Sequence, residues 1–146
     1  MNDIEFANKM SPFLGKPWIL GDNGSKGWDC VSSMRTFFDS CGIKLPEEFK
    51  GWTWENYPER WERGEGMDIM KEYLLSLGDP VDVNYIRPGD IIVLEVKQNG
   101  NNLVSAGLYI GNGLFQVVAK EHGVMRIPIR LYKLAGAIIG VRRLIK

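Results

Sequence analysis

A cysteine at the predicted start of a helix constrains this chain more than any other feature. A glycine-rich segment without clear periodicity, residues 15–27, ends near Asp29, and from Cys30 onward apolar residues recur every three or four positions. Asp29 is a favourable N-cap residue, so Cys30 falls in the first helical turn, where free backbone N–H groups and the helix dipole favour a thiolate. The pattern therefore predicts a nucleophilic cysteine. It also fits a small buried hydrophobe, which free cysteine commonly is.

The rest of the pattern places helices before strands. Helical spacing predicts a helix over residues 3–13 and another over residues 66–77, the second ended by Gly78. After residues 87–90 the period changes to short β-branched runs, which predict strands over residues 91–96, 103–110, 114–119, 124–129 and 136–145. This order predicts an α+β fold. We expect one domain, residues 1–146, with N-terminal helices packed on a small, strongly curved antiparallel sheet of about five strands.

Charge and hydropathy exclude several classes of partner. Eighteen basic residues balance eighteen acidic ones, so we expect binding neither to nucleic acid nor to a membrane surface. No apolar run is long enough to span a bilayer, and the first residues lack the apolar core of a signal peptide, so we expect synthesis in the cytoplasm without a signal peptide. Two cysteines about 16 Å apart on one helix and a single histidine predict free thiols, no metal site and no cofactor.

Four motifs resemble, in order and spacing, those of the NlpC/P60 cysteine peptidases. They are GKPWILG at 15–21, GWDC at 27–30, RPGDII at 87–92 and GLYIGNGLF at 107–115. The compact length and the segments 41–46 and 137–143 are most similar to single-domain versions encoded with phage tail-tip genes. The resemblance covers nearly the whole chain and implies a papain-like core.

The resemblance also implies a reaction. In this family a cysteine at a helix N-terminus attacks an amide, usually the γ-D-glutamyl to diamino-acid bond of the peptidoglycan stem peptide. A histidine at the start of the second strand is the base, and a polar residue on the next strand orients it. Cys30 matches the nucleophile, and Trp18 lies where the family often has an aromatic residue beside the site. The base position, however, is Ser105, and the orienting position is Val117, or Gln116 if the register slips by one.

His122 is the only histidine in the sequence. If the strands around residues 111–113 form a hairpin, His122 lies opposite about Asn102, roughly 10 Å along the strand from Ser105. It therefore reaches the site only through a flexible loop, and an exposed loop histidine is the plainer interpretation. Our candidate residues are Cys30, Ser105 and His122 for catalysis, and Trp18, Asp29, Ser32 and Gln116 for substrate binding.

Two functions fit this pattern. The first is a peptidoglycan stem-peptide endopeptidase or amidase that uses Cys30 but is impaired, because losing a positioned general acid typically costs roughly 10²- to 10⁴-fold. The second is a catalytically silent structural or peptidoglycan-binding component of a phage tail, virion-associated and bound to tail proteins at the cell wall. An engineered or strain-specific replacement of the histidine by Ser105 is a third alternative. The tryptophan-rich segment 49–63 fits either a sugar- or peptide-stacking surface or part of a core or lid.

Overall fold

The computed structural model describes residues 3–19, 27, 29–57, 67–98, 100–119, 122–134 and 136–145. Its helices come first, as predicted, and occupy Asp3–Met10 (α1), Cys30–Ser40 (α2) and Met67–Ser76 (α4), with a short 3-10 turn at Ser11–Phe13 after α1. Pro12 in that turn stops the α-helical pattern earlier than the predicted residue 13. Gly78, just after α4, has a φ of 52°, a conformation that favours glycine and ends the helix as predicted.

The strands form one antiparallel sheet of six strands in the order β3-β8-β4-β5-β6-β7. Four of them make a meander: Ile91–Gln98 (β4), Asn101–Gly111 (β5), Leu114–Ala119 (β6) and Gly123–Pro128 (β7). The chain then returns through a short helix, Ile129–Leu134 (α5), to strand β8 (Ile138–Arg143), which pairs with β4 and with the edge strand β3 (Asp79–Pro80). A separate two-stranded hairpin joins Glu48–Phe49 (β1) to Trp52–Thr53 (β2). The α+β prediction is confirmed. Periodicity missed the two-residue strands and the six-residue helix α5, because such short elements carry no measurable period.

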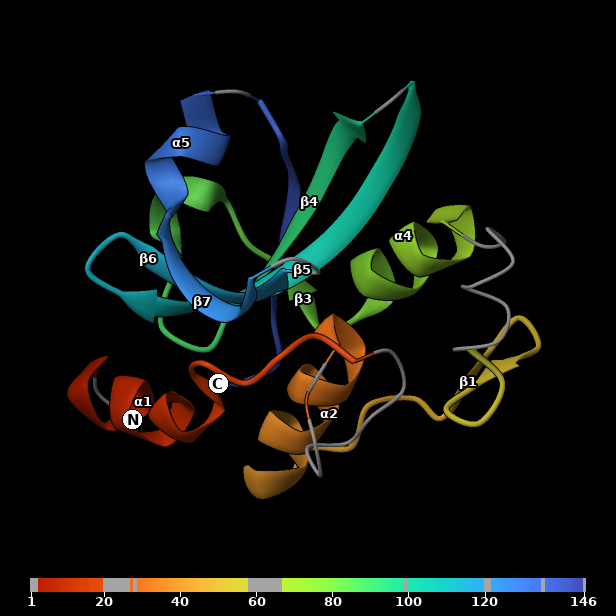
Figure 1. Ribbon diagram of the computed structural model, residues 1–146, viewed down its shortest axis with the longest axis horizontal. Helices are drawn as coiled ribbons and strands as arrows, with labels where there is room; N and C mark the ends of the chain where they lie inside the picture. The colour runs from red at the N-terminus through yellow and green to blue at the C-terminus, as the bar shows by residue number, and fades with distance from the viewer. Residues whose placement is uncertain are drawn as a thin grey trace.

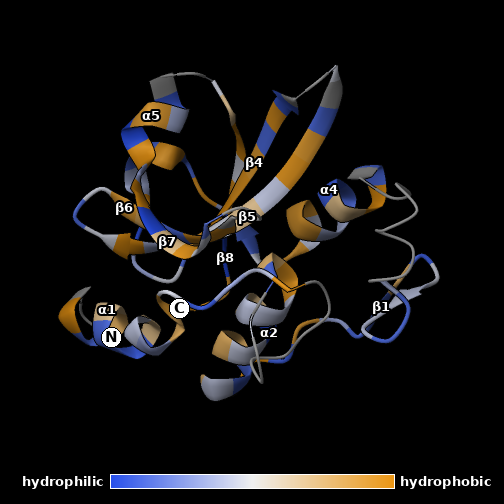
Figure 2. Cartoon of the chain, in the orientation of Figure 1, coloured by the Kyte–Doolittle hydropathy of each residue, from blue (hydrophilic) through white to orange (hydrophobic). Residues whose placement is uncertain are grey.

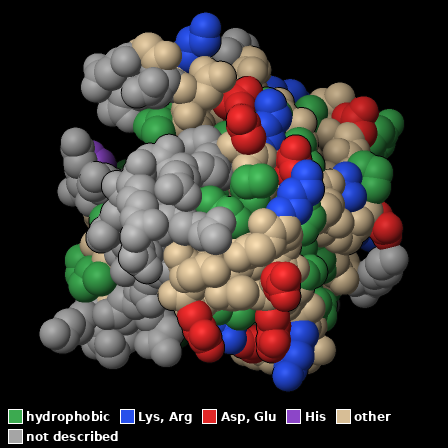
Figure 3. All heavy atoms as spheres, turned by 90° about the vertical axis from the view of Figure 1, so that its right-hand side faces the viewer, with side chains coloured by type: hydrophobic (Ala, Val, Ile, Leu, Met, Phe, Trp, Pro, Cys, Tyr) green, Lys and Arg blue, Asp and Glu red, His purple; other side chains and the backbone are tan. Residues whose placement is uncertain are grey.

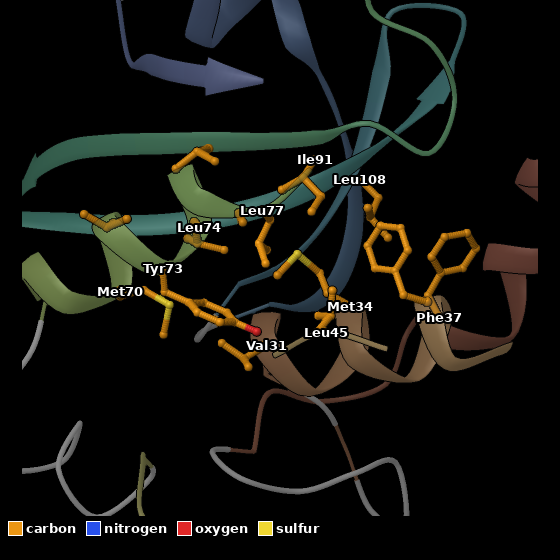
Figure 4. Close-up of a cluster of buried hydrophobic side chains, with 14 of the residues drawn as sticks. Val31, Met34, Phe37, Leu45, Met70, Tyr73, Leu74, Leu77, Ile91 and Leu108 are labelled. Carbon is orange, nitrogen blue, oxygen red and sulfur yellow. The ribbon is translucent and has the colours of Figure 1, made fainter. Parts of the chain in front are cut away.

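The sheet has two apolar faces, each covered by different helices (Figure 1). Alternate residues of β5, including Ala106 and Leu108, belong to the larger core cluster with the buried side of α2 and α4. In Figure 4, side chains from α2, α4, β4 and β5 point toward one another in this cluster. The opposite face packs against α5 through Ile92, Leu94 and Phe115. Figure 2 shows hydrophobic stretches along the strands and in the helices. Alternation along β5 therefore separates the residues that face α2 and α4 from those that face α5.

A buried ion pair closes the end of the sheet and explains the RPGD motif. Asp90 is 2% exposed, and its carboxylate accepts hydrogen bonds from Nε and Nη2 of Arg143 at 2.8 and 2.7 Å. The same carboxylate accepts from the backbone N–H of Arg87 at 2.8 Å. This bidentate contact joins the start of β4 to the end of β8.

Candidate active site

Asp29 and Ser32 fix the N-terminus of α2, and with it the position of Cys30. The Asp29 carboxylate accepts a hydrogen bond from the backbone N–H of Ser32 at 2.7 Å, and the Ser32 hydroxyl accepts one from the backbone N–H of Asp29 at 3.0 Å. These reciprocal bonds form a capping box, which satisfies two of the free N–H groups at the helix start. The predicted N-cap is confirmed. Both polar side chains are buried, so the structural role accounts for their presence.

Cys30 is partly buried and lies against strand β5. The backbone amide of Ala106 donates to the Cys30 thiol. Because strand N–H groups point along the sheet, between neighbouring strands, this contact places the sulfur at the edge of β5 rather than over either face. The residues next to Ala106 on β5 are therefore the ones that lie nearest to the sulfur along this strand.

The surroundings of Cys30 raise the pKa of its thiol, in the direction opposite to that predicted from the helix dipole. Burial, together with the adjacent Asp29 carboxylate, raises the pKa of Cys30 from 9.0 to about 12. Backbone hydrogen bonds, including the one from Ala106, lower the pKa but do not offset burial. The dipole of a helix supplies only about half a unit of positive charge, whereas Asp29 brings a full negative charge to the next residue. Burial and the Asp29 carboxylate therefore outweigh the helix dipole at Cys30.

Tyr57 is a neighbour of the site that the sequence analysis missed. Its hydroxyl donates to the Asp29 carboxylate at 2.5 Å. Burial raises the pKa of Tyr57, and the charge of Asp29 raises it further. The tyrosine therefore remains a hydrogen-bond donor and holds the carboxylate next to Cys30. Tyr57 lies 28 residues from Asp29, and no local pattern relates positions so far apart.

Ser105, the residue that the resemblance places at the base position, lies on β5 directly before Ala106. The β4–β5 ladder is regular here and pairs Ser105 with Leu94. Since successive side chains of a strand point to opposite faces, Ser105 is on the Leu94 side of the sheet, and Ala106 is on the side of α2. Ser105 is half-buried. The backbone of Ser105 therefore lies next to the Ala106 amide that contacts Cys30, while its side chain points to the face of the sheet opposite α2.

The next strand supplies no polar partner at the orienting position. Leu108 of β5 pairs with Gln116 of β6, so Val117 shares the face of Ser105 and lies in the apolar cluster on that face. Gln116 points the other way. Its amide donates to the backbone carbonyl of Met10 at 3.0 Å and accepts from Arg126 at 3.0 Å. Gln116 therefore ties β6 to α1, and these bonds account for its burial.

Trp18 and His122 lie at the end of the sheet where β6 turns into β7. Trp18 is half-buried and packs on Val118 and Val124. His122 is exposed in the turn before β7. The ladder between β5 and β6 ends at Leu108 and Gln116, so His122 is not paired opposite Asn102 as the hairpin prediction had it, and its exposure fits a loop histidine. Where the structure describes the chain, no three His, Cys, Asp or Glu side chains are placed to hold a metal ion, and no described helix is long and apolar enough to cross a membrane.

Comparison with known proteins gives one family. The model of the NlpC/P60 family matches residues 15–143. No curated protein matches the sequence. Among solved structures, an NlpC/P60 family protein from Bacillus cereus is 23% identical, with a TM-score of 0.67 over 98% of this chain and 40% of its own length.

Two single-domain structures match over almost their full length. The NlpC/P60 domain of the peptidoglycan hydrolase SagA is 16% identical, with a TM-score of 0.63 over 99% of this chain and all of its own. The P60 domain of an antigen from M. avium paratuberculosis is 17% identical, with a TM-score of 0.59 over 98% of this chain and 93% of its own. The chain thus spans less than half of the B. cereus protein but corresponds to the whole of these isolated domains.

Proposed function

Since this chain belongs to the NlpC/P60 family, we propose that it is directed to peptidoglycan stem peptides, with Cys30 as a poorly activated nucleophile. The observation that carries the proposal is the position of Cys30, at a capped helix N-terminus with its sulfur against the backbone of Ala106. The peptidoglycan hydrolase named among the structural relatives supports the substrate class.

The expected reaction has two proton steps, and the site supports each poorly. Cys30 must lose its proton to attack the amide carbonyl, and the leaving amine must gain one when the C–N bond breaks. A thiol of pKa about 12 is a thiolate in only about one molecule in 10⁵ at pH 7. Ser105 cannot exchange a proton near neutral pH, and His122 is exposed beyond the end of β6. We therefore expect substrate binding with very slow cleavage.

The test compares the wild type with Cys30→Ala on a γ-D-glutamyl-diaminopimelate peptide. We expect both proteins to bind the peptide saturably, and only the wild type to release product, slowly, at high protein concentration. His122→Ala is the matched control, and we expect it to leave the slow rate unchanged. A failure to bind the peptide would refute the substrate class, and a rate that His122→Ala abolishes would make His122 the base.

A catalytically silent member of a phage tail is the second candidate, and Ser105 at the base position favours it. In this case the peptide binds, but no cleavage depends on Cys30. The expected partners are then phage tail proteins, and mass spectrometry of purified virions would detect this chain among them. Cleavage that Cys30→Ala abolishes would exclude the silent alternative.

A further inference from the structure

Tyr57, in the tryptophan-rich segment, is held in place by a turn and by an aromatic neighbour. The side-chain oxygen of Asn56 accepts from the backbone N–H of Thr53 at 2.9 Å, and the Thr53 hydroxyl accepts from the backbone N–H of Asn56 at 3.2 Å. The Tyr57 ring packs edge-on against Trp54, with a centroid distance of 6.1 Å. The tyrosine is only 7% exposed. Its position is therefore fixed through both its backbone and its ring.

The Tyr57 hydroxyl meets a carboxylate that is itself fixed beside Cys30. It donates to Oδ2 of Asp29 at 2.5 Å, whereas Oδ1 of Asp29 accepts from the backbone N–H of Ser32 in the capping box. Asp29 is 2% exposed, and its negative charge raises the pKa of the adjacent thiol. Because the two donors approach different oxygens, removing the tyrosine hydroxyl leaves the cap bond in place. The carboxylate then stays beside Cys30 with less of its charge compensated.

A hydroxyl that points at a carboxylate compensates part of its negative charge. Such charge-assisted hydrogen bonds are about twice as strong as neutral ones, and they are strongest where water is excluded. Since like charges disfavour one another, a less compensated carboxylate makes the neighbouring thiolate harder to form. Tyr57 is within electrostatic range of the thiol, because an ionised Cys30 raises the pKa of Tyr57. Burial also raises the pKa of Tyr57, so the tyrosine keeps its proton and continues to donate.

We propose that Tyr57 is a positioning residue for Cys30, which acts through the Asp29 carboxylate and makes the thiol more reactive than this buried carboxylate alone would allow. The inference rests on the proposed function, because it takes Cys30 as the nucleophile. It goes further by placing a control of the nucleophile after the β1–β2 hairpin, outside the four motifs of the resemblance. A tyrosine with a structural role alone would stabilise the fold without changing the reactivity of the thiol.

Arg35 is a second charged side chain that acts on Tyr57. Its guanidinium lies 4.7 Å from the centre of the Trp54 ring, and its positive charge lowers the pKa of Tyr57. Asp29 is the charged side chain that raises the pKa of Cys30. On the outer surface where α4 and β1 lie, acidic and basic side chains lie close together (Figure 3), and water and salt screen them. The buried carboxylate is therefore the charge through which Tyr57 reaches Cys30.

The experiment measures the rate at which Cys30 reacts with 4,4′-dithiodipyridine between about pH 7 and 10, in a Cys41→Ser background. Tyr57→Phe removes the hydroxyl and keeps the ring. We expect this variant to react about threefold more slowly. The loss of one charge-assisted hydrogen bond reduces the thiolate population on the order of tenfold, and the stronger nucleophilicity of the remaining thiolate offsets part of this loss.

Tyr73→Phe is the matched control. Tyr73 is also 7% exposed and packs on the same Trp54 ring, with a centroid distance of 6.2 Å. Its hydroxyl, however, donates to the carbonyl of Pro46 at 3.2 Å. We therefore expect Tyr73→Phe to leave the rate of exchange unchanged. Urea unfolding of each variant verifies the fold and measures any loss of stability separately.

The same change in an Asp29→Asn background tests the route of the effect. Because asparagine carries no charge for the hydroxyl to compensate, we expect Tyr57→Phe to leave the exchange rate unchanged there. A further measurement keeps every tyrosine ring and hydroxyl. Biosynthetic 3-fluorotyrosine has a more acidic hydroxyl and donates more strongly, so it should speed the exchange of the chain with Tyr57, and it should have no effect in Tyr57→Phe.

Several results would overturn the inference. Tyr57→Phe could leave the rate unchanged or raise it, Tyr73→Phe could slow the exchange equally, the effect of Tyr57→Phe could persist with Asp29→Asn, or fluorotyrosine could fail to speed the exchange. The assay contains no peptide, so it separates this inference from the proposed substrate. A chain that fails to bind the stem peptide but shows slower exchange in Tyr57→Phe would refute the substrate class and keep the positioning role.

Discussion

Replacing Ser105 by histidine tests the link between the β5 position and the state of the Cys30 thiol. Ser105 directly precedes the residue whose backbone amide contacts the sulfur. An imidazolium there would pair with the thiolate and oppose the two causes that raise the pKa of Cys30, which are burial and the Asp29 charge. We expect Ser105→His to lower the pKa of Cys30 from about 12 to 9.0 or below.

The size of the effect follows from the two pKa values. A fall from about 12 to 9.0 increases the thiolate population at pH 7 about 10³-fold. The intrinsic nucleophilicity of the thiolate falls with its pKa, with a coefficient of about 0.4–0.5, which removes roughly 16- to 32-fold. The net gain in the rate of thiol–disulfide exchange at pH 7 is then about 30- to 60-fold. Hydrolysis of the stem peptide should rise on the order of 10²-fold, because the imidazole also donates a proton to the leaving amine.

The assay is the pH dependence of the reaction with 4,4′-dithiodipyridine, in a Cys41→Ser background that leaves Cys30 as the only thiol. Ser105→Gln is the matched control, because glutamine has a similar size and polarity but does not titrate. We expect the pKa of Cys30 in Ser105→Gln to equal its value in the protein with Ser105. If the pKa of Cys30 stays near 12 in Ser105→His, the side chain at 105 remains on the Leu94 face, and the proposed base position is refuted.

Three further predictions use the same structure. Asp29→Asn should lower the pKa of Cys30 and speed its thiol–disulfide exchange, because it removes the negative charge while an amide oxygen still caps the helix. Burial, the larger cause, should keep the pKa of Cys30 above 9.0. An unchanged pH dependence of the exchange rate would contradict this account. Cys30→Ala should lose less stability than the wild type above pH 9. The pKa of the Cys30 thiol is about 12 in the folded protein and 9.0 in the unfolded chain. The protonated thiol therefore contributes fully to the free energy of unfolding below pH 9, and this contribution is lost as the pH rises from 9 to 12. At pH 10.5 the loss is at most about 2 kcal/mol, measured by urea titrations of the wild type and Cys30→Ala, and parallel pH curves for the two proteins would refute this. Arg143→Met should cost about 3–5 kcal/mol, because it leaves the Asp90 charge buried without its guanidinium partner. The matched Arg142→Met removes only bonds to carbonyls and should shift the urea midpoint much less.

The local elements and the order of the motifs follow from the sequence alone. The helix N-terminus at Cys30 was predictable because a capping residue and the helical period act within a few positions. The strands β4 to β8 were predictable for the same reason, and their order with the helices gave the α+β class. The family motifs placed Ser105 and Val117 at the base and orienting positions, and the ladder of β5 and β6 puts both on one face.

The pKa of the Cys30 thiol depends on tertiary packing. Burial and the charge of Asp29, held in place by the distant Tyr57, raise the pKa of the thiol against the helix dipole. The bonds that engage Gln116 likewise come from α1 and β7, far away in the chain. Desolvation and charge act through space and depend on what packs around a group, whereas propensity and periodicity act along the chain. The position of Cys30 at a helix N-terminus is therefore a property of the sequence, and the pKa of its thiol is a property of the fold.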